Sequence, residues 1–427
     1  MRHQNVLPMQ SRQAFVTRQR FAFAGAIVAG ALLPFALRLT VFPDPRYFHT
    51  SQVSLIANLS AIMISTWVRM SVGTFPGTRS GTLIAPSIAA AHGIVLALLL
   101  MTRLPYDRLV SLTGFLAHLV WAVGLHVSVH RKVRRRFAVV PVGTVDHLEQ
   151  IEGVDWKRMH RATLDETRDC DAVVADFAAD LPPDWERFLA DAALDGRMVF
   201  QVKQLSESLT GRVEVGHLSE NSFGNLMPAR GYFHLKAIMD FMVALILLPI
   251  LALPMLLLGL AIRLDSRGPA LFQQGRLGLA GKPIKVYKFR TMKVHDAGDD
   301  ERSAAMTDHK DDRITRLGGF LRRSRIDELP QMINILKGEM SWIGPRPEAL
   351  VLSNWYVGEI PFYRYRHVVR PGISGWAQVN QGHVAEVDAV HEKLQYDFFY
   401  IKYFSPWLDL LILFRTIKTM LTGFGSR

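Results

Sequence analysis

The sequence contains a single cysteine, Cys170, among 427 residues. A disulfide bond within the chain and a zinc site built from several thiolates are therefore excluded. Negative charge is also scarce, because 38 acidic residues face 50 lysines and arginines and the formal net charge is +12. No nucleic-acid-binding module accompanies this positive charge, so nucleic acid is not an expected partner.

The glycine-rich fingerprint of dinucleotide-binding proteins is missing as well. Gly143 stands alone at the turn where such a fingerprint would be needed. The stretch Gly275–Gly281 is rich in glycine, but it has neither Walker nor Rossmann spacing and is expected to form a turn. We therefore assign no nicotinamide cofactor to this chain.

Long apolar runs, in contrast, are abundant. Four of them occupy the first third of the chain, and each is close to the ~20 residues that a membrane-spanning helix needs. They cover Phe21–Phe42, Val53–Val72, Leu83–Met101 and Leu109–Val129. We expect a four-helix transmembrane bundle over residues 15–132. A buried helical core of a soluble domain is the alternative, but four such runs in succession are unusual there.

The distribution of basic residues predicts how this bundle is oriented, since cytoplasmic segments carry the excess of lysine and arginine. The first 20 residues hold four arginines, and residues 131–136 hold five basic residues. The connections expected on the other side hold only Arg46 in one case, and Arg103 and Arg108 in the other. Both ends of the bundle should therefore face the cytoplasm.

Residues 137–230 have a different pattern. Strand-like runs at Phe137–Val142, Ala172–Ala175 and Met198–Val202 alternate with helical patterns such as Trp185–Asp195. This alternation predicts a small cytoplasmic α/β domain with a parallel sheet.

A fifth apolar segment, residues 237–262, follows this domain and has basic residues on both flanks. Pro249 and Pro254 lie in its middle, where proline removes a backbone donor and bends a helix. A fifth full span would carry the rest of the chain out of the cytoplasm. We therefore expect a re-entrant helix that returns to the cytoplasmic face, and an ordinary kinked span is the alternative.

Beyond this segment, an adjacent carboxylate pair, Asp327 and Glu328, lies among many arginines. One carboxylate of such a pair can act as nucleophile or base while the other holds a divalent metal, and arginines can clamp phosphate oxygens. Adjacent residues on a helix point about 100° apart, which suits two different roles. A lone pair of acids would more often be a helix-terminal feature, so the flanking motifs matter.

Those motifs carry a resemblance. The string Asp327-Glu328-Leu329-Pro330-Gln331 resembles the catalytic signature of the bacterial sugar transferases that load a phospho-sugar onto undecaprenyl phosphate, the monotopic phosphoglycosyl transferases. Three more strings agree in order, namely Lys288–Met292, Gly344–Pro347 and Arg370–Val379. The similarity covers about residues 233–425. It implies a mainly helical catalytic domain over 233–427 with a re-entrant membrane helix, broken near Leu253-Pro254. In the large form of this family, a four-helix membrane bundle and a Rossmann-like domain precede it.

The resemblance also implies roles for individual residues. Asp327 is the expected nucleophile, which attacks the β-phosphate of a UDP-sugar and releases UMP; undecaprenyl phosphate then takes the phospho-sugar. Glu328 is expected to hold Mg²⁺ (or Mn²⁺) or to act as a base. The expected substrate-binding residues are mostly basic, with one further acid: Lys288, Arg290, Arg322, Arg323, Arg346, Arg370 and Asp397.

The expected protein is thus a multi-pass enzyme of the bacterial inner membrane, with its catalytic domain on the cytoplasmic face. It would transfer a hexose 1-phosphate and initiate exopolysaccharide, capsule or O-antigen synthesis, and the resemblance favours a homodimer. Two alternatives remain. One is a non-catalytic membrane scaffold or regulator of polysaccharide export, against which the intact acidic pair argues. The other is a membrane-tethered nucleotide-sugar oxidoreductase, against which the missing glycine fingerprint argues.

Overall fold

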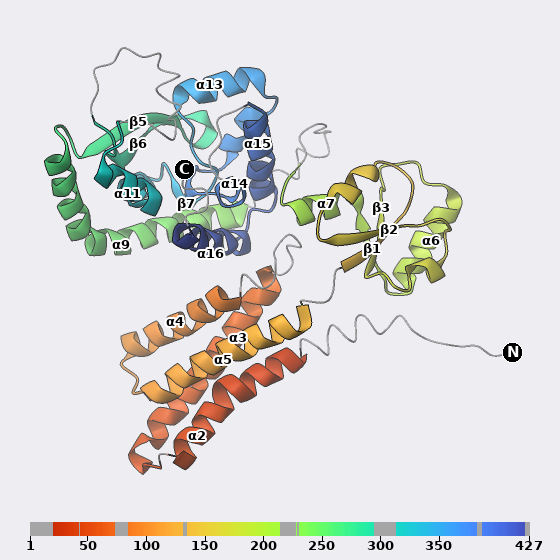
Figure 1. The fold of residues 1–427 in the computed structure, drawn as a ribbon, viewed down its shortest axis with the longest axis horizontal. Coiled ribbons are helices and arrows are strands. Elements are labelled where there is room, and N and C mark those ends of the chain that lie inside the picture. Colours follow the sequence, from red (N-terminus) through yellow and green to blue (C-terminus); the bar gives the residue numbers. More distant parts are fainter. Residues whose placement is uncertain are drawn as a thin grey trace. The chain divides into compact units, whose positions relative to one another are not determined.

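The computed structural model describes residues 20–41, 43–72, 84–130, 135–213, 228, 230–293, 313–381 and 387–422. The chain divides into two compact units, one before and one after the bond between Gly211 and Arg212. The first unit contains a helical bundle and a small sheet, and the second is mainly helical (Figure 1).

Four long apolar helices form the bundle, as predicted. They are Arg20–Val41, which contains the π-helical turn η1 (Val28–Leu32) and α2 (Leu33–Val41), then α3 (Phe48–Val72), α4 (Ile84–Thr102) and α5 (Arg108–His130). Only between 22% and 33% of the apolar stretch of each is buried within the protein. Apolar side chains such as Met101 and Val120 face outward, and such a surface is stable against lipid rather than water. The basic residues before residue 20 and at 131–134, which predict the orientation, lie outside the described residues.

The sheet of the first unit has four parallel strands in the order β2-β1-β3-β4. The strands are β1 (Arg135–Val139), β2 (Val154–Arg158), β3 (Ala172–Ala175) and β4 (Met198–Gln201). Apolar residues of α6 (Pro183–Leu194) pack on one face and those of α7 (Val202–Thr210) on the other. The predicted parallel α/β domain is confirmed. Strand β2 was not predicted, because Asp155, Lys157 and Arg158 hide the strand pattern of an edge strand.

The second unit begins with one long helix, α9 (Arg230–Asp265), which contains the predicted fifth apolar segment. The remaining elements are short. They are β5 (Leu271–Leu277), β6 (Pro283–Phe289), α11 (Arg316–Ser324), the 3-10 helix η7 (Ile326–Gln331), α12 (Met332–Leu336), β7 (Ser341–Ile343), α13 (Leu350–Glu359), η8 (Tyr363–Val368), β8 (Gly372–Ser374), α14 (Trp376–Asn380), α15 (Val387–Lys402) and α16 (Pro406–Thr422). Strands β5 and β6 form an antiparallel hairpin, and β7 pairs with β8 in parallel.

Helix α9 is apolar on almost every side, with only 6% of its apolar stretch buried in the protein. It contains Pro249 and Pro254, and the ribbon bends along its length (Figure 1). Two separate cores hold it. Ala244 packs with Val286, Ile335 and Met340, whereas Ile262 packs with Phe289 and Leu321. Both halves of the apolar helix are therefore attached to the same globular body.

Polar contacts fasten the two ends of α9 as well. Near its start, Lys236 lies 2.7 Å from Asp409 of α16, and Asp240 accepts a hydrogen bond of 2.5 Å from Ser341. Beyond its last turn, the buried Arg290 donates to the carbonyl of Ser266 at 2.6 Å and to that of Arg267 at 2.9 Å. These donors satisfy carbonyl groups that a helix end leaves without an intrahelical partner.

Candidate active site

The acidic pair lies in η7, which directly follows α11. The turn between them is made by Arg325 in a left-handed conformation, with φ of 56°. Such a conformation is uncommon for a residue with a side chain and is often kept at functional sites. Helix α11 can approach the end of β6 because Gly318 has no side chain; a Cβ there would lie 2.0 Å from the carbonyl oxygen of Thr291. Ile326 and Leu329 pack against the core that holds Ile262, so η7 is fixed in place.

Glu328 is buried and bound by two cations. Its Oε1 accepts hydrogen bonds from Lys288 at 3.0 Å and from Arg346 at 2.7 Å. Its other oxygen, Oε2, is buried and has no hydrogen-bond partner among the described residues. One of its two oxygens is thus committed to the protein, and the other remains available.

The two neighbouring carboxyl groups have opposite pKa shifts. Burial, together with the nearby charge of Glu328, raises the pKa of Asp327 to about 6. Burial also opposes ionisation of Glu328, but Arg346 and Lys288 outweigh it and hold the pKa of Glu328 well below its usual range. Neighbouring acids whose pKa values are pushed apart are typical of catalytic sites, where each acid has a separate task.

Three of the predicted basic residues gather at this pair. Lys288 and Arg346 bind Glu328 directly. Arg322 donates to the hydroxyl of Thr291 at 2.8 Å and is close enough to Asp327 to favour its ionised form. Their positive charges surround the carboxylates, and this is the arrangement that a bound diphosphate requires.

Three other predicted residues are engaged elsewhere. Arg290 binds carbonyl groups at the end of α9, as described above. Arg323 is exposed and donates to Gly319 of its own helix at 3.3 Å. Arg370 donates to the carbonyl of Gly338 at 3.0 Å, and its guanidinium lies 5.1 Å from the centre of the Phe233 ring.

The seventh predicted residue, Asp397, belongs to a second buried group of charges that adjoins the first. Asp397 lies 2.8 Å from Arg366, whose guanidinium also donates to the carbonyl of Arg346 at 2.8 Å. Glu348, two residues after Arg346, is bound by Lys393 and lies 3.9 Å from Arg276. The second group is therefore connected to the first through Arg346.

Four members of this second group were not predicted as site residues: Arg276, Glu348, Arg366 and Lys393. Arg276 lies in the glycine-containing stretch that was expected to form a turn; it belongs to the end of β5, and the turn of the β5–β6 hairpin follows at residues 278–282. Its guanidinium donates to the carbonyl of Pro347 at 2.7 Å. A signal was present for Glu348, because it directly follows the Gly344–Pro347 string.

The acidic pair could supply some, but not all, of the ligands of a divalent cation. Mg²⁺ commonly takes one or two carboxylates from the protein and completes its shell with water and substrate phosphates. The free Oε2 of Glu328 and the adjacent Asp327 could supply those carboxylates. No group of three or more His, Cys, Asp or Glu side chains suited to a metal occurs in the described part of the chain. A cation at this pair would therefore depend on the oxygens of the substrate.

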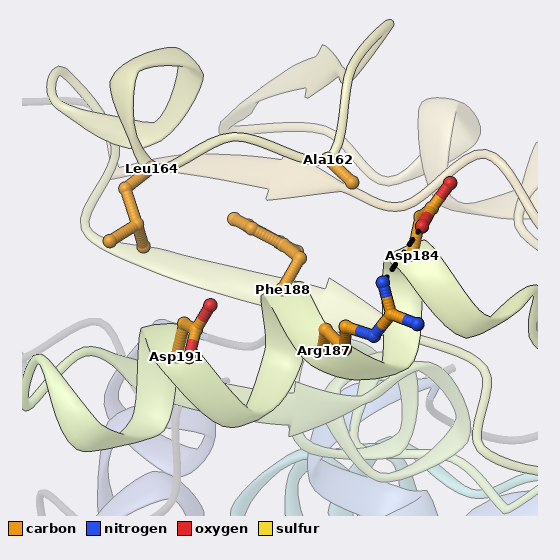
Figure 2. Close-up of a pocket in the computed structure, with 6 residues that line it drawn as sticks. All are labelled: Ala162, Leu164, Asp184, Arg187, Phe188 and Asp191. Atoms are coloured by element: carbon orange, nitrogen blue, oxygen red, sulfur yellow. Dashed lines mark ion pairs between the residues drawn. The ribbon is translucent and has the colours of Figure 1, made fainter.

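Residues 135–213, the described part of the α/β domain, hold no comparable constellation. A hollow of about 390 Å³ lies beside α6, and Figure 2 shows Phe188 in its wall and Arg187 directed toward Asp184. At the carboxyl ends of β1 and β3, where open α/β sheets bind ligands, Asp176 accepts hydrogen bonds from the backbone and hydroxyl of Thr144 at 3.0 and 2.9 Å. These donors at the edge of the sheet are thus already bonded to the protein's own carboxylate.

The site has two neighbouring acids with opposite pKa shifts and three cations beside them, and the long apolar helix α9 is attached to the same globular body. These features indicate a membrane enzyme that acts on phosphate groups. The model of the family described as "Bacterial sugar transferase" matches residues 231–423. Over 407 residues, and 95% of each chain, the sequence is 40% identical to the UDP-N-acetylgalactosamine-undecaprenyl-phosphate N-acetylgalactosaminephosphotransferase of Aeromonas hydrophila. The chain therefore belongs to the bacterial sugar transferase family.

Other relatives match less than half of this chain. The UDP-glucose:undecaprenyl-phosphate glucose-1-phosphate transferase of Escherichia coli (strain K12) is 40% identical over 185 residues, which is 43% of this chain and 39% of that protein. The exopolysaccharide production protein PSS of Rhizobium leguminosarum bv. phaseoli is 40% identical over 193 residues, 44% of this chain and 96% of that protein. The family match over residues 231–423 contains Asp327, Glu328 and the cations around them.

Proposed function

We propose that this chain transfers a sugar 1-phosphate from a UDP-sugar to undecaprenyl phosphate and so initiates exopolysaccharide synthesis. The observation that carries the proposal is the pairing of Asp327, with its raised pKa, and Glu328, which Lys288 and Arg346 hold ionised. The raised pKa of Asp327 also argues against a non-catalytic scaffold, because a carboxyl group kept in an unfavourable setting is typical of a functional site.

In the first step, a carboxylate oxygen of Asp327 attacks the β-phosphorus of the UDP-sugar. The bond from that phosphorus to the bridging oxygen breaks, and UMP leaves with the oxygen and the electron pair. In the second step, a phosphate oxygen of undecaprenyl phosphate attacks the same phosphorus and the Asp327 carboxylate is released. The product is undecaprenyl diphosphate sugar, and the enzyme returns to its starting state.

The surrounding residues have distinct tasks in this scheme. Arg346 and Lys288 hold Glu328 and add positive charge beside the diphosphate, and Arg322 adds more on the side of Asp327. A divalent cation held by Glu328 Oε2 and Asp327 would neutralise charge that develops on the phosphate oxygens. Arg290, Arg323 and Arg370 were proposed as further phosphate ligands, but their observed partners favour structural tasks.

The sugar that we favour is N-acetylgalactosamine. The Aeromonas relative named for that sugar matches this chain over 95% of its length, whereas the Escherichia coli relative named for glucose matches 43% of it. A hexose without the acetamido group remains the second candidate.

The test is a transfer assay with purified full-length protein, undecaprenyl phosphate, Mg²⁺ and radiolabelled UDP-sugars. We expect label to enter the lipid phase with UDP-N-acetylgalactosamine, and UMP to be released in equal amount. Lipid labelled only from UDP-glucose or UDP-galactose would correct the sugar. Release of UDP instead of UMP, or no transfer from any UDP-sugar, would refute the proposed reaction.

We further propose that α9 is re-entrant and that the transferase domain faces the cytoplasm, where nucleotide sugars are made. Support comes from the attachment of both of its halves to one globular body and from the two prolines inside it. The parallel α/β domain has the strand order 2-1-3-4 of a flavodoxin-like doubly wound sheet, and we propose a structural or regulatory task for it. A homodimer and a divalent cation are part of the same proposal.

A further inference from the structure

Two residues that directly follow the α/β domain are bonded to helix α15 of the second unit. Arg212 forms an ion pair with Glu392, and its guanidinium carbon lies 4.8 Å from the centre of the Tyr396 ring. The backbone N–H of Val213 donates to the carbonyl of Gln395 at 3.0 Å, and its side chain is buried. An ion pair, a cation–π contact, a hydrogen bond and a buried valine fix this segment on the helix.

A different side of α15 faces the second group of charges. Lys393 binds Glu348, and Asp397 lies 2.8 Å from Arg366. With about 100° of rotation per residue, residues 393 and 397 point about 60° to 160° away from residues 392, 395 and 396, and about 120° on average. Helix α15 is thus held between the segment at 212–213 on one side and buried ion pairs on the other.

These ion pairs are buried deeply enough to be sensitive to position. Lys393 and Arg366 are each 3% exposed and Asp397 is 1% exposed. Buried charges depend on good geometry with their partners, because water cannot replace a lost contact. Arg366 also donates to the carbonyl of Arg346, and the Arg346 side chain binds Glu328. A shift of α15 would therefore reach Arg346 through two successive contacts.

We propose that Arg212 and Val213 are positioning residues of the transferase site. They hold α15 so that Lys393 and Asp397 keep Glu348 and Arg366 in place, and these in turn place Arg346 beside the acidic pair. The proposal deepens the proposed function and rests on it for its kinetic readout. It also places the start of the functional transferase domain at residue 212, ahead of the expected boundary at 233.

The kinetic test uses the full-length protein with Arg212→Met, Glu392→Gln and the charge-reversed double variant Arg212→Glu with Glu392→Arg. We expect each single variant to raise the KM for the UDP-sugar about three- to tenfold, while kcat per folded enzyme changes less. The double variant should recover part of the loss. The matched control is Arg168→Met, which removes an exposed ion pair with Asp165 in the α/β domain and should leave KM unchanged.

A merely structural role would lower the amount of folded enzyme without changing KM, so an unchanged KM in Arg212→Met would overturn the proposal. A second readout does not need activity. Amide hydrogen exchange in α15 should be faster in Arg212→Met than in the wild type, and equal exchange would again overturn it. If the wild type itself transfers no sugar phosphate, the proposed function fails, and the exchange measurement alone decides whether the segment holds α15.

Discussion

Asp327 and Glu328 are neighbours in the chain, yet their surroundings give them opposite tasks. Lys288 and Arg346 bind Glu328 and hold its pKa well below its usual range, so it is ionised at neutral pH. Asp327 has no such ion pair among the described residues and is partly buried next to that negative charge; the burial and the charge together raise its pKa to about 6. A carboxylate that is ionised at neutral pH but held in an unfavourable setting is a better nucleophile than a fully neutralised one.

The variant Asp327→Asn should lose at least 1,000-fold in transfer rate, of the order seen when an essential nucleophile is removed. It should not lose stability. The folded-state pKa of Asp327 lies above its ordinary value of 3.8, so its stabilising contribution is complete below that value and lost as pH rises through about 6. At pH 8 the variant should therefore melt at the same or a higher temperature than the wild type in detergent.

The contrasting variant is Glu328→Gln, which leaves Lys288 and Arg346 without their counter-charge. Breaking a buried pair in this way costs about 3–5 kcal/mol, so this variant should melt at a lower temperature as well as lose activity.

Near-normal turnover by purified Asp327→Asn would exclude the covalent mechanism. A large fall in its melting temperature would show that Asp327 has a structural task instead.

The pH dependence of the first step follows from the same raised pKa. Attack on the UDP-sugar needs ionised Asp327, so the rate should fall about tenfold per pH unit as pH drops below about 6. The measurement is the initial release of UMP in the absence of undecaprenyl phosphate, which isolates this step. Any activity left in Glu328→Gln should fall at a lower pH, because the like charge is gone. A wild-type midpoint near the ordinary value of 3.8 would contradict the assignment.

At the scale of elements, the two predicted phosphate ligands Arg290 and Arg323 differ in burial and in the contacts they make. Arg290 is buried and donates to carbonyl groups at the end of α9, and Arg323 is exposed. The variant Arg290→Met should lower the melting temperature by several degrees, because it removes the partly buried hydrogen bonds to Ser266 and Arg267, each worth about 0.5–1.5 kcal/mol. The matched variant Arg323→Met should change it little. Thermal unfolding of the two variants tests this difference, and the KM for the UDP-sugar is measured on the same samples. A raised KM with unchanged stability in Arg290→Met would favour a direct phosphate contact.

The elements themselves were largely predictable from the sequence. Runs of about twenty apolar residues indicated α3 and α5 because lipid exposure leaves few polar positions in such helices. Strand β3 can be predicted from the sequence because it is apolar throughout. The charged edge strand β2 cannot. The acidic pair was found by its adjacency and its flanking strings.

The second group of charges could not be predicted in the same way. Glu348 and Lys393 are 45 residues apart, and each alone has the pattern of a solvated surface charge. Their pairing depends on how α15 packs, which no local pattern records. The same holds for Arg290, because its position in the sequence does not show that it reaches the end of α9. Sequence patterns thus indicate which residues carry charge, and the tertiary fold decides which of those charges meet.

At the scale of the whole molecule, the question is how α9 meets the membrane. Its 36 residues would extend for about 54 Å if straight, well beyond the ~30 Å apolar core of a bilayer. Lys236 near its start and Ser266 just after its end are both bonded to one polar body, which cannot lie on both sides of a membrane. A helix that enters one leaflet, bends near Pro249 and Pro254 and returns satisfies these contacts.

This topology predicts the accessibility of single cysteines introduced into a Cys170→Ser background. We would place them by Arg46→Cys in the connection between α2 and α3, by Glu152→Cys in the α/β domain, and by Lys282→Cys after α9; all three positions are exposed. In intact spheroplasts a membrane-impermeant maleimide should label the first variant only, and permeabilisation should make the other two reactive.

The first variant, Arg46→Cys, is the positive control, because it shows that the outer face is reached. Labelling of Lys282→Cys in intact spheroplasts, with Glu152→Cys still protected, would mean that α9 spans the bilayer fully. Asp327 would then lie outside the cytoplasm, away from the UDP-sugars, and the proposed cytoplasmic transferase site would be wrong.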